Sequence, residues 1–551
     1  MNSKLVLISD FNISALARYI SADESNAGLV VSETPYGQVF AALTKAYDKS
    51  ISDFAFIWSR PESISACFSA ALKGYEIDEQ GCIDEITAFC ETIKTFSQYF
   101  KNCFVASFTL SKDSIDYGLL DWKPGIGLSR LITILNLKMA EILSATDNIY
   151  ILDANRWLLD GKADNLPKMW FAAKVPFHNN VYQCAAKNLL AAIDAVNGLG
   201  KRIIFLDLDN TLWGSVVGEN GWKGIRLGGH DHVGEAFVDF QHKLKALSLR
   251  GIQLALVSKN EEAVALDAID NHPDMVLKRS DFAAWRINWN DKAQNIADIL
   301  SEINLGDYSA VFIDDNPVER DRVRSALPNL TVPEWPEDPS MYTRYLADLR
   351  CFDSPSLSKE DRSRTQSYSA NRERVSLKVD SMTNWLEQLG TTVTVSDLDE
   401  SNLQRASQLF NKTNQLNLST RRLSAEELLD WSEADSRSSV VCSVRDKFGD
   451  LGLTGIVSIE MQGSQAYLID FVLSCRVMGR EVEEALIFIA SELATNMSAR
   501  TLKIAYIETD RNIPTLSVLE SSALIKSKPH TFYWDCSLTY AQPSSVTIEY
   551  E

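Results

Sequence analysis

Reactive side chains gather in the middle of the chain, most of them at the end of an apolar run. The runs are RIIFL, IQLALV and AVFI, and the side chains that follow them, with one lysine between the last two runs, are Asp207, Asp209, Thr211, Ser258, Lys259, Lys292, Asp314 and Asp315. Continuous apolar runs are typical of parallel strands covered on both faces. Ligands of open α/β sheets gather beyond the carboxyl ends of such strands, so we expect these side chains to meet at one edge.

The acidic members of this set suit magnesium and phosphate chemistry. Carboxylates from two different strands, Asp207 and Asp314, can hold one Mg²⁺ through oxygen ligands, and Asp209 and Asp315 complete the expected metal set. Bound Mg²⁺ lets an anionic carboxylate approach an anionic phosphate. Asp207 can then attack phosphorus and form an aspartyl-phosphate. Asp209, two residues on, can protonate the leaving oxygen and later activate the resolving nucleophile.

The remaining members suit phosphate binding. Ser258 and Lys292 can hold the phosphoryl oxygens and neutralise the developing charge, and Thr211 and Lys259 are expected beside them. The set therefore predicts magnesium-dependent phosphoryl transfer. The alternative interpretation is that these residues are solvated acids at the ends of loops. Their occurrence at the ends of several predicted strands argues against this alternative.

The surrounding elements predict a doubly wound parallel sheet over residues 200–340. We expect strands at IIFL, IQLALVS, MVL (275–277) and AVFIDD, with a helix at VGEAFVDFQHKLKALSLRG that Gly251 ends. Asp207 and Ser258 are 51 residues apart, and Ser258 and Lys292 are 34 apart. Neither span has room for a large inserted cap domain. The site should therefore be open unless a hairpin-like flap (212–229), a flanking domain or a partner covers it.

Other domains flank this one. Residues 1–195 alternate short apolar runs with amphipathic helical patterns and predict an α/β domain. Residues 341–385 are polar and predict a helical connector. Residues 386–551 predict an α+β domain with strands at TTVTVSDL, SVVCSVRD, LTGIVSIEMQ, AYLIDFVLS and LKIAYIET, and a helix at EVEEALIFIASELA.

Composition narrows the possible partners. The chain has 551 residues, a net charge of −20 and a pI of about 4.9, which argues against nucleic acid and against an anionic membrane surface. We find no signal peptide and no run of 18 apolar residues. The nine cysteines show no metal-binding spacing, which is typical of reduced thiols in the cytoplasm.

The motif order resembles the haloacid dehalogenase (HAD) superfamily. DLDNT, a serine at a second strand end, an intervening lysine and DD at a third strand end match its four motifs in sequence. The segments DLDNTLWGSVVGENGWKGIRLG, VSKNEEAVALDAI, FIDDNPVERDRVRSALP and SCRVMGREVEEAL resemble its FkbH-like branch more closely. The resemblance implies a capless Rossmann-like phosphatase domain. It also implies transfer of a three-carbon acyl group from 1,3-bisphosphoglycerate to the phosphopantetheine thiol of an acyl carrier protein, in polyketide or surface-polysaccharide synthesis.

The C-terminal domain resembles the acetyltransferase (GNAT) fold. The turn from Arg476 through Gly479 to Arg480 is similar to the segment that binds the pyrophosphate of coenzyme A at a helix start. The resemblance implies a groove for phosphopantetheine or coenzyme A, with Cys475 as a candidate acyl-accepting nucleophile. Asn414 and Arg445 belong to polar clusters that could line this groove. The alternatives are an ordinary turn, a buried cysteine packed as a small apolar side chain, and capping or turn chemistry for the polar clusters.

The N-terminal domain resembles SGNH hydrolases, with Ser9 where a nucleophile would follow the first strand. No Asp-x-x-His follows, since His178 lies in PFHNN, so we expect a docking or lid domain rather than a hydrolase. Three functions remain open. They are a glyceryltransferase/phosphatase, a phosphatase of a small metabolite such as a sugar phosphate, and an acyl-CoA-dependent acyltransferase with a structural HAD domain.

Overall fold

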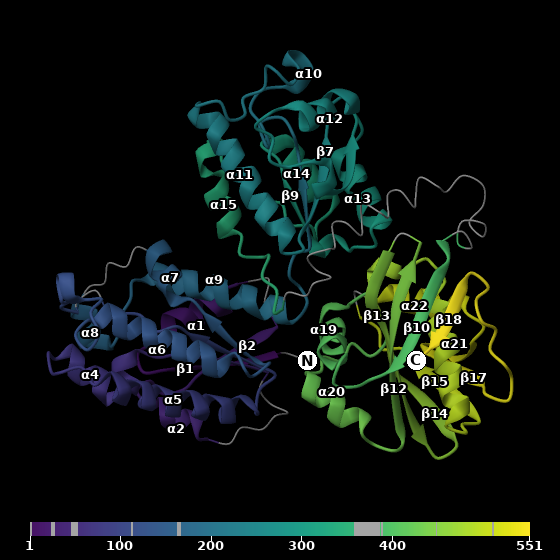
Figure 1. The fold of residues 1–551 in the computed structure, drawn as a ribbon, viewed down its shortest axis with the longest axis horizontal. Coiled ribbons are helices and arrows are strands. Elements are labelled where there is room, and N and C mark those ends of the chain that lie inside the picture. Colours follow the sequence, from purple (N-terminus) through teal and green to yellow (C-terminus); the bar gives the residue numbers. More distant parts are fainter. Residues whose placement is uncertain are drawn as a thin grey trace. The chain divides into compact units, whose positions relative to one another are not determined.

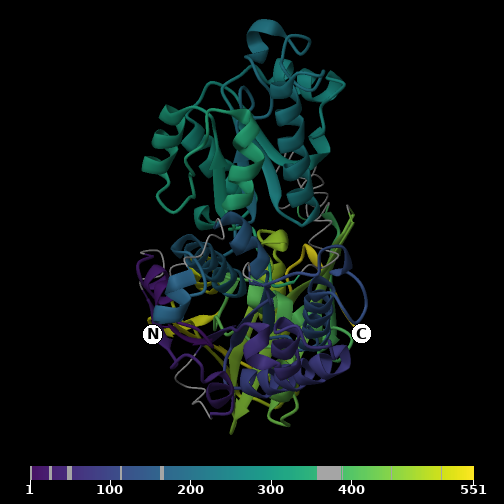
Figure 2. The same cartoon turned by 90° about the vertical axis from the view of Figure 1, so that its left-hand side faces the viewer.

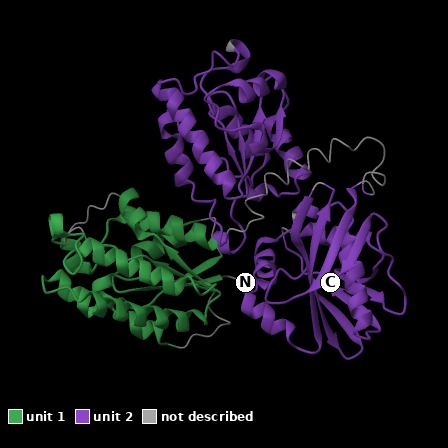
Figure 3. Ribbon diagram, viewed as in Figure 1, with its two compact units in different colours: residues 1–193 green, residues 194–551 purple. Residues whose placement is uncertain are grey.

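The computed structural model describes residues 3–23, 28–45, 53–111, 114–161, 167–356, 386, 389–447, 449–509 and 512–551. The chain forms two compact units, residues 1–193 and 194–551 (Figure 3). Each unit contains at least one sheet and its own apolar core.

The first unit is built on a five-stranded parallel sheet. Its strand order is β2-β1-β3-β4-β5, and its strands are β1 (Ser3–Ser9), β2 (Leu29–Glu33), β3 (Phe54–Trp58), β4 (Asn102–Ala106) and β5 (Ile149–Leu152). This order is one of the two common doubly wound arrangements. The sequence prediction of an α/β domain is confirmed here.

Helices supply the core on one face of this sheet. Side chains of β1, β3 and β4 pack against α2 (Val39–Leu43), α4 (Ala66–Leu72), α5 (Glu79–Ser97) and α6 (Leu128–Leu143). The other helices are α1 (Ser14–Ser21), α3 (Pro61–Ile64), α7 (Ala154–Asp160), α8 (Pro167–Ala173) and α9 (Asn179–Val196).

The first part of the second unit contains a four-stranded parallel sheet. Its order is β8-β7-β6-β9, and its strands are β6 (Ile203–Leu206), β7 (Gln253–Ser258), β8 (Phe282–Ile287) and β9 (Ala310–Ile313). Every residue of β6, β7 and β9 is buried, as their unbroken apolar sequences predict. The predicted doubly wound sheet is confirmed.

Helices cover both faces of this sheet. One face packs on α11 (His232–Leu249), α12 (Glu262–Asn271) and α15 (Tyr342–Asp348), and the other packs on α13 (Lys292–Glu302). Figures 1 and 2 show α11 and α15 together on one side of the sheet. The remaining elements are α10 (Val217–Asn220), α14 (Pro317–Ala326) and the 3-10 turns η3 (Arg279–Asp281), η4 (Asp307–Ser309) and η5 (Pro339–Met341).

The predicted strand at Met275–Leu277 is wrong. Met275 and Leu277 are buried, which explains the apolar pattern. The backbone N–H groups of Val276 and Leu277, however, donate to Gln241 Oε1 over 3.0 and 3.2 Å. A buried side chain of α11 thus satisfies amides that a neighbouring strand would otherwise satisfy. The strand of this region is β8, which begins at Phe282.

The last part of the second unit forms a mostly antiparallel sheet. Its order is β16-β17-β15-β14-β13-β12-β10-β18, and the short strand β11 (Leu416–Asn417) pairs with β14. The other strands are β10 (Thr391–Asp397), β12 (Arg437–Asp446), β13 (Gly449–Gln462), β14 (Gln465–Leu473), β15 (Thr501–Ala505), β16 (Ile525–Lys528), β17 (Thr531–Asp535) and β18 (Val546–Tyr550). All five strands expected from the sequence are present.

Among the residues that the structure describes, several helices accompany this sheet. They are α19 (Leu403–Lys412), α20 (Ala425–Ser432), α21 (Val482–Asn496) and α22 (Ile513–Ser521), with the turn η6 (Cys475–Val477) before α21. The expected helix at residues 481–494 is α21. Residues 357–385 of the predicted connector lie outside the described residues. In the described part of the chain, no helix combines the length and apolarity needed to cross a bilayer.

Candidate active site

Three neighbouring strands bring the predicted residues to one edge of the four-stranded sheet. β6 pairs in parallel with β7 on one side and with β9 on the other. Asp207 and Asp314 directly follow β6 and β9, and Ser258 is the last residue of β7. The Asp207 N–H continues the ladder by donating to Ile313 O over 3.1 Å, which fixes the two acidic positions against each other.

A buried lysine lies between two carboxylates at this edge. Lys292 Nζ lies 3.0 Å from Asp207 Oδ1 and 2.6 Å from Asp314 Oδ2. Burial opposes the charge of Lys292, but the two carboxylates outweigh burial and raise its pKa above the ordinary value. Burial, followed by the charge of Asp207, raises the pKa of Asp314. The same two causes raise the pKa of Asp315.

These carboxylates fit a divalent cation. Asp207, Asp314 and Asp315 each offer an oxygen, and these oxygens lie within 4.8 Å of one another. Asp207 Oδ1 is buried, and the Lys292 ammonium lies 3.0 Å from it. Three acids with one lysine leave an excess of negative charge in a buried place, which a bound cation would offset. Hard oxygen ligands of this kind suit Mg²⁺.

The Asp209 side chain is not among the three carboxylates whose oxygens lie within 4.8 Å of one another, and its predicted role in metal binding stays a prediction. Its Oδ1 accepts hydrogen bonds from Trp213 Nε1 over 2.8 Å and from the Val217 N–H over 3.0 Å. Its Oδ2 accepts from Asn260 Nδ2 over 2.8 Å. These three donors hold the carboxylate away from the cluster. They leave Asp209 available for the predicted proton transfer, since it remains next to the nucleophile's strand end.

The predicted phosphate-binding residues divide into two groups. Ser258 and Thr211 are buried at the site, and Thr211 Oγ1 donates to Asp315 Oδ1 over 3.4 Å. Lys292 is buried with them. Lys259, in contrast, forms an ion pair with Glu319 on α14 over 2.6 Å. Its ammonium therefore has a structural partner within the fold.

The site is capless, as the spacing predicts. Between Asp207 and Ser258 the chain forms only a flap, α10 and α11, and between Ser258 and Lys292 it forms α12, η3 and β8. The base of the flap is closed by Gly214 and Arg226, whose N–H groups donate to each other's carbonyl over 3.0 and 2.8 Å. No inserted domain is present in this fully traced stretch of backbone.

Sequence reasoning missed three positioning residues. Arg320 is buried, and its Nη1 donates to the carbonyls of Asp314 and Asp315 over 2.9 and 2.8 Å. Tyr342 OH donates to Asn210 O over 2.8 Å. Asn210 has a φ of 55°, a left-handed conformation that asparagine tolerates well, and it turns the chain after the nucleophile. The signal for Arg320 was its place in DDNPVER, one helical turn beyond the acidic pair.

The predicted acyl-binding arginines mostly serve the fold. Arg480 is buried and forms an ion pair over 3.0 Å with Asp446, whose side chain is inaccessible to solvent. Arg445 of β12 pairs with Glu549 of β18 over 3.0 Å at the surface. Gly479 has a φ of 73°, and its N–H donates to Glu483 Oε1 over 2.5 Å. A carboxylate of α21 therefore already accepts a hydrogen bond from the turn that precedes this helix.

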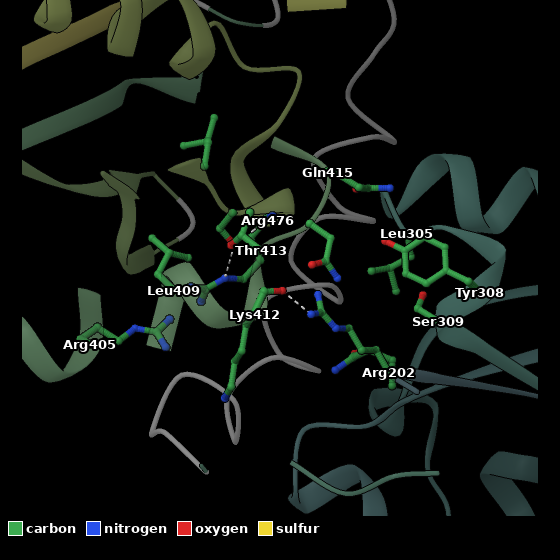
Figure 4. Close-up of a pocket in the computed structure, with 14 residues that line it drawn as sticks. Arg202, Leu305, Tyr308, Ser309, Arg405, Leu409, Lys412, Thr413, Gln415 and Arg476 are labelled. Carbon is green, nitrogen blue, oxygen red and sulfur yellow. Dashed lines mark hydrogen bonds between the residues drawn. The ribbon is translucent and has the colours of Figure 1, made fainter. Parts of the chain in front are cut away.

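Two predicted residues of the C-terminal domain, Asn414 and Arg476, line one cavity of the second unit (Figure 4). Asn414 Nδ2 donates to Gly198 O over 3.0 Å. Arg476 Nε donates to Ser474 Oγ over 3.2 Å. The Cys475 side chain lies outside the described part of the structure, so its predicted role stays a prediction.

The first unit places Ser9 at the end of β1, where it is buried. Ser9 Oγ accepts a hydrogen bond from the Phe11 N–H over 3.2 Å, and Phe11 packs on Trp58. Asp10 pairs with Arg60 over 2.8 Å. His178 Nδ1 accepts from the Asn180 N–H over 3.3 Å. Ser9 therefore precedes a turn, and its hydroxyl accepts a hydrogen bond from the backbone of that turn.

One solved structure is similar to much of this chain. It is the N-terminal part of protein BF1531 from Bacteroides fragilis, which contains a phosphatase domain complexed with Mg. The identity is 28% and the TM-score 0.59, over 64% of this chain and 95% of that one. The chain contains a HAD-like phosphatase domain. Because β6 to α15 is less than a third of the chain, the likeness also includes residues outside this domain.

Other comparisons are weaker. The ribosomal-protein-S18-alanine N-acetyltransferase from Escherichia coli matches 26% of this chain and 95% of its own, at 10% identity and a TM-score of 0.21. The PaiA N-acetyltransferase from Thermoplasma acidophilum, in complex with coenzyme A, matches 26% and 96%, at 12% identity and a TM-score of 0.20. No protein-family model matches the sequence, and no curated protein matches it.

Proposed function

We propose that the buried acidic cluster performs magnesium-dependent phosphoryl transfer on a small phosphorylated substrate, with Asp207 as nucleophile. The observation that carries the proposal is the meeting of Asp207, Asp314 and Asp315 within 4.8 Å, with Lys292 between two of them. A set of solvated acids at loop ends would be exposed, whereas Asp207, Asp314 and Lys292 are buried.

Asp207, Asp314 and Asp315 are the residues that would hold Mg²⁺. Bound there, the ion would screen the negative charges of the carboxylates and of a phosphate. Thr211 orients Asp315 through its hydroxyl, and Arg320 holds the backbone on which Asp314 and Asp315 stand. These contacts preorganise the carboxylates before any ligand arrives.

The chain's own groups account for the rest of the reaction. An oxygen of Asp207 attacks phosphorus and forms the aspartyl-phosphate as the bond from phosphorus to the leaving oxygen breaks. Asp209 donates a proton to that leaving oxygen, and it then takes a proton from the water that hydrolyses the aspartyl-phosphate. Ser258 and Lys292 hold the phosphoryl oxygens, so the negative charge of the transition state faces a hydroxyl and an ammonium.

We further propose that the substrate is a three-carbon acyl phosphate, 1,3-bisphosphoglycerate, and that the acyl acceptor is the phosphopantetheine thiol of an acyl carrier protein. The thiol gives up its proton and attacks the C1 carbonyl carbon, so that the C–S bond forms as the C–O bond to the acyl phosphate breaks and inorganic phosphate leaves. The Asp207 step then acts on the remaining phosphate ester. The support is the resemblance of the sequence to the FkbH-like branch over both parts of the second unit. The C-terminal domain would bind the thiol arm, and the first unit, with its SGNH-like sequence, would serve docking.

A stand-alone phosphatase of a small metabolite is the second candidate. Two arginines of the C-terminal domain favour this candidate. Arg445 and Arg480, which were predicted to bind the acyl group or pantetheine, both form ion pairs within the fold. An acyltransferase with a purely structural HAD domain is the least supported. A structural domain has no need of three carboxylates and a lysine at the ends of its strands, since burying charge is costly.

The deciding experiment is intact-mass spectrometry of a phosphopantetheinylated carrier protein after incubation with the enzyme, Mg²⁺ and 1,3-bisphosphoglycerate. Asp207→Asn serves as the control. A glyceryl adduct that is absent with the variant supports the transferase. Phosphate release from small phosphate esters without any adduct supports the second candidate. Phosphate release by Asp207→Asn at the wild-type rate would contradict both.

A further inference from the structure

A cavity of the second unit lies where the four-stranded sheet meets α19 and the end of β14 (Figure 4). Its volume is about 50 Å³. About 10–15 Å³ by the same measure holds one water, so the space takes a small polyatomic ion or group. Its lining includes Arg202, Gln253, Arg405, Lys412, Asn414 and Arg476.

The lining is strongly basic. Of the fourteen described residues that line it, four are cationic, and none of these fourteen is Asp or Glu. The chain as a whole has 74 acidic and 54 basic residues, so a wall with four cations and no acid runs against the composition. Such a wall favours an anionic ligand, because a positive surface in a low-dielectric recess concentrates negative charge.

Arg202 is held firmly at this wall. Its backbone N–H donates to Ser309 O over 2.7 Å, and its carbonyl accepts from the Gln253 N–H over 2.8 Å. Its guanidinium donates to the carbonyl of Lys412, the last residue of α19. The main chain of Arg202 is therefore fixed between two strand starts. Arginine is well suited to phosphate because its planar donors match the oxygens of that group.

Buried polar groups complete the lining. Gln253, Asn414 and Arg476 are each more than nine-tenths buried. Gln253 Nε2 donates to Gly251 O over 3.3 Å, which sets the orientation of the amide, and Gln253 Oε1 accepts no hydrogen bond. A buried polar atom without a partner is costly. A ligand that bears a hydroxyl, such as hydrogen phosphate or a phosphate ester with an alcohol group, could satisfy this acceptor.

This cavity is separate from the phosphatase site. Arg202 precedes β6, Gln253 begins β7 and Ser309 precedes β9, whereas Asp207, Ser258 and Asp314 lie at the other ends of these strands. The four residues of β6 alone span about 13 Å at roughly 3.3 Å per residue. A ligand in the cavity would not touch the acidic cluster.

We propose that this cavity binds a small phosphate-type oxyanion, either inorganic phosphate or the phosphate of an organic ester. The proposal does not depend on the phosphatase mechanism, because no residue of the acidic cluster lines the cavity. It assigns to the second unit a second anion site at the opposite edge of its parallel sheet.

Isothermal titration calorimetry of the full chain in EDTA at low salt tests this assignment. Inorganic phosphate is the first probe, and 4′-phosphopantetheine is the second, since it carries the same group on an organic arm. Arg202→Gln and Arg405→Gln each remove one cation from the cavity. Ser258→Ala alters only the phosphatase site, and Arg344→Gln removes an exposed arginine of α15 as the matched control.

We expect one phosphate per chain, bound about tenfold more weakly by each cavity variant and unchanged in Ser258→Ala and Arg344→Gln. If 4′-phosphopantetheine binds more tightly than phosphate with the same variant pattern, the ligand is an organic ester, and equal affinities indicate the inorganic ion. Absence of binding by both probes overturns the proposal, as does weakening by Ser258→Ala alone. If Arg202→Gln fails to fold, as judged by circular dichroism, Arg405→Gln decides.

Discussion

Asn260 holds Asp209 in place through a hydrogen bond of 2.8 Å from its Nδ2 to the carboxylate Oδ2. Asn260 is itself buried, two residues beyond the end of β7, and its amide also lies 3.4 Å from Ser258 Oγ. The carboxylate of Asp209, which follows β6, is thus oriented by the amide of Asn260, which follows β7. Asn260 is a positioning residue, since it acts through Asp209 rather than on the substrate.

We expect Asn260→Ala to lower kcat of phosphate release about ten- to hundredfold with little change in KM, because misplacing an acid–base group costs part of its contribution. Steady-state kinetics on a small phosphate ester measures the split. Asn271→Ala, which removes an exposed asparagine bonded to Asp267, is the control. An equal rise in KM without a change in kcat would assign Asn260 to substrate binding instead.

Asp207→Asn should abolish phosphate release while the fold is kept. The amide has nearly the same shape as the carboxylate but is a far weaker nucleophile. It also removes a like charge next to Asp314, whose pKa burial and Asp207 raise. The metal-free variant should therefore unfold at a temperature equal to or above that of the wild type, as calorimetry can measure. Residual activity near the wild-type level would exclude Asp207 as nucleophile.

Removal of Mg²⁺ should stop activity and lower stability. EDTA should abolish phosphate release, and Mg²⁺ at about 100 times its dissociation constant should stabilise the native state by about 2.7 kcal/mol. Thermal unfolding with and without Mg²⁺ measures this effect. In Asp314→Asn most of the increase should disappear, because the variant loses a ligand from the cluster. Full turnover in metal-free buffer would contradict the proposed metal site.

Lys292→Met should destabilise the metal-free protein by about 3–5 kcal/mol, because it leaves two buried carboxylates without their cation. Urea unfolding monitored by fluorescence measures the loss. The partly exposed pair of Lys259 and Glu319 provides the contrast, and Lys259→Met should cost no more than about 1 kcal/mol. Equal effects of the two variants would show that Lys292 has no special electrostatic role.

Cys475→Ser should block acyl transfer to the carrier protein and spare phosphate release, if the thiol accepts the acyl group. The oxygen nucleophile of serine is much less reactive at neutral pH than a thiolate. Intact-mass spectrometry of the carrier and a phosphate assay on the same samples separate the two steps. Loss of both steps, or of neither, would remove Cys475 from the acyl-carrier role.

Sequence patterns predicted the elements of the phosphatase part well, because continuous apolar runs such as those of β6 and β9 are typical of buried parallel strands. They also placed Asp207, Ser258, Lys292 and Asp314 at one edge, since parallel strands must end together. Sequence patterns could not predict in which direction each side chain points. That Asp209 turns away to Asn260, that Arg480 pairs with Asp446, and that Gln241 replaces a strand partner of Val276 and Leu277 all depend on contacts between residues far apart in the chain.

The hydrogen bond from Tyr342 OH to the carbonyl of Asn210 joins positions 132 residues apart. During synthesis, the turn behind the nucleophile therefore gains this support only after α15 has left the ribosome. A fragment cut at residue 340, beyond β9 and α14, would contain every acidic group of the site and still lack this tether. Dissection of the chain into independently folding pieces should therefore keep α15 with the strands that precede it.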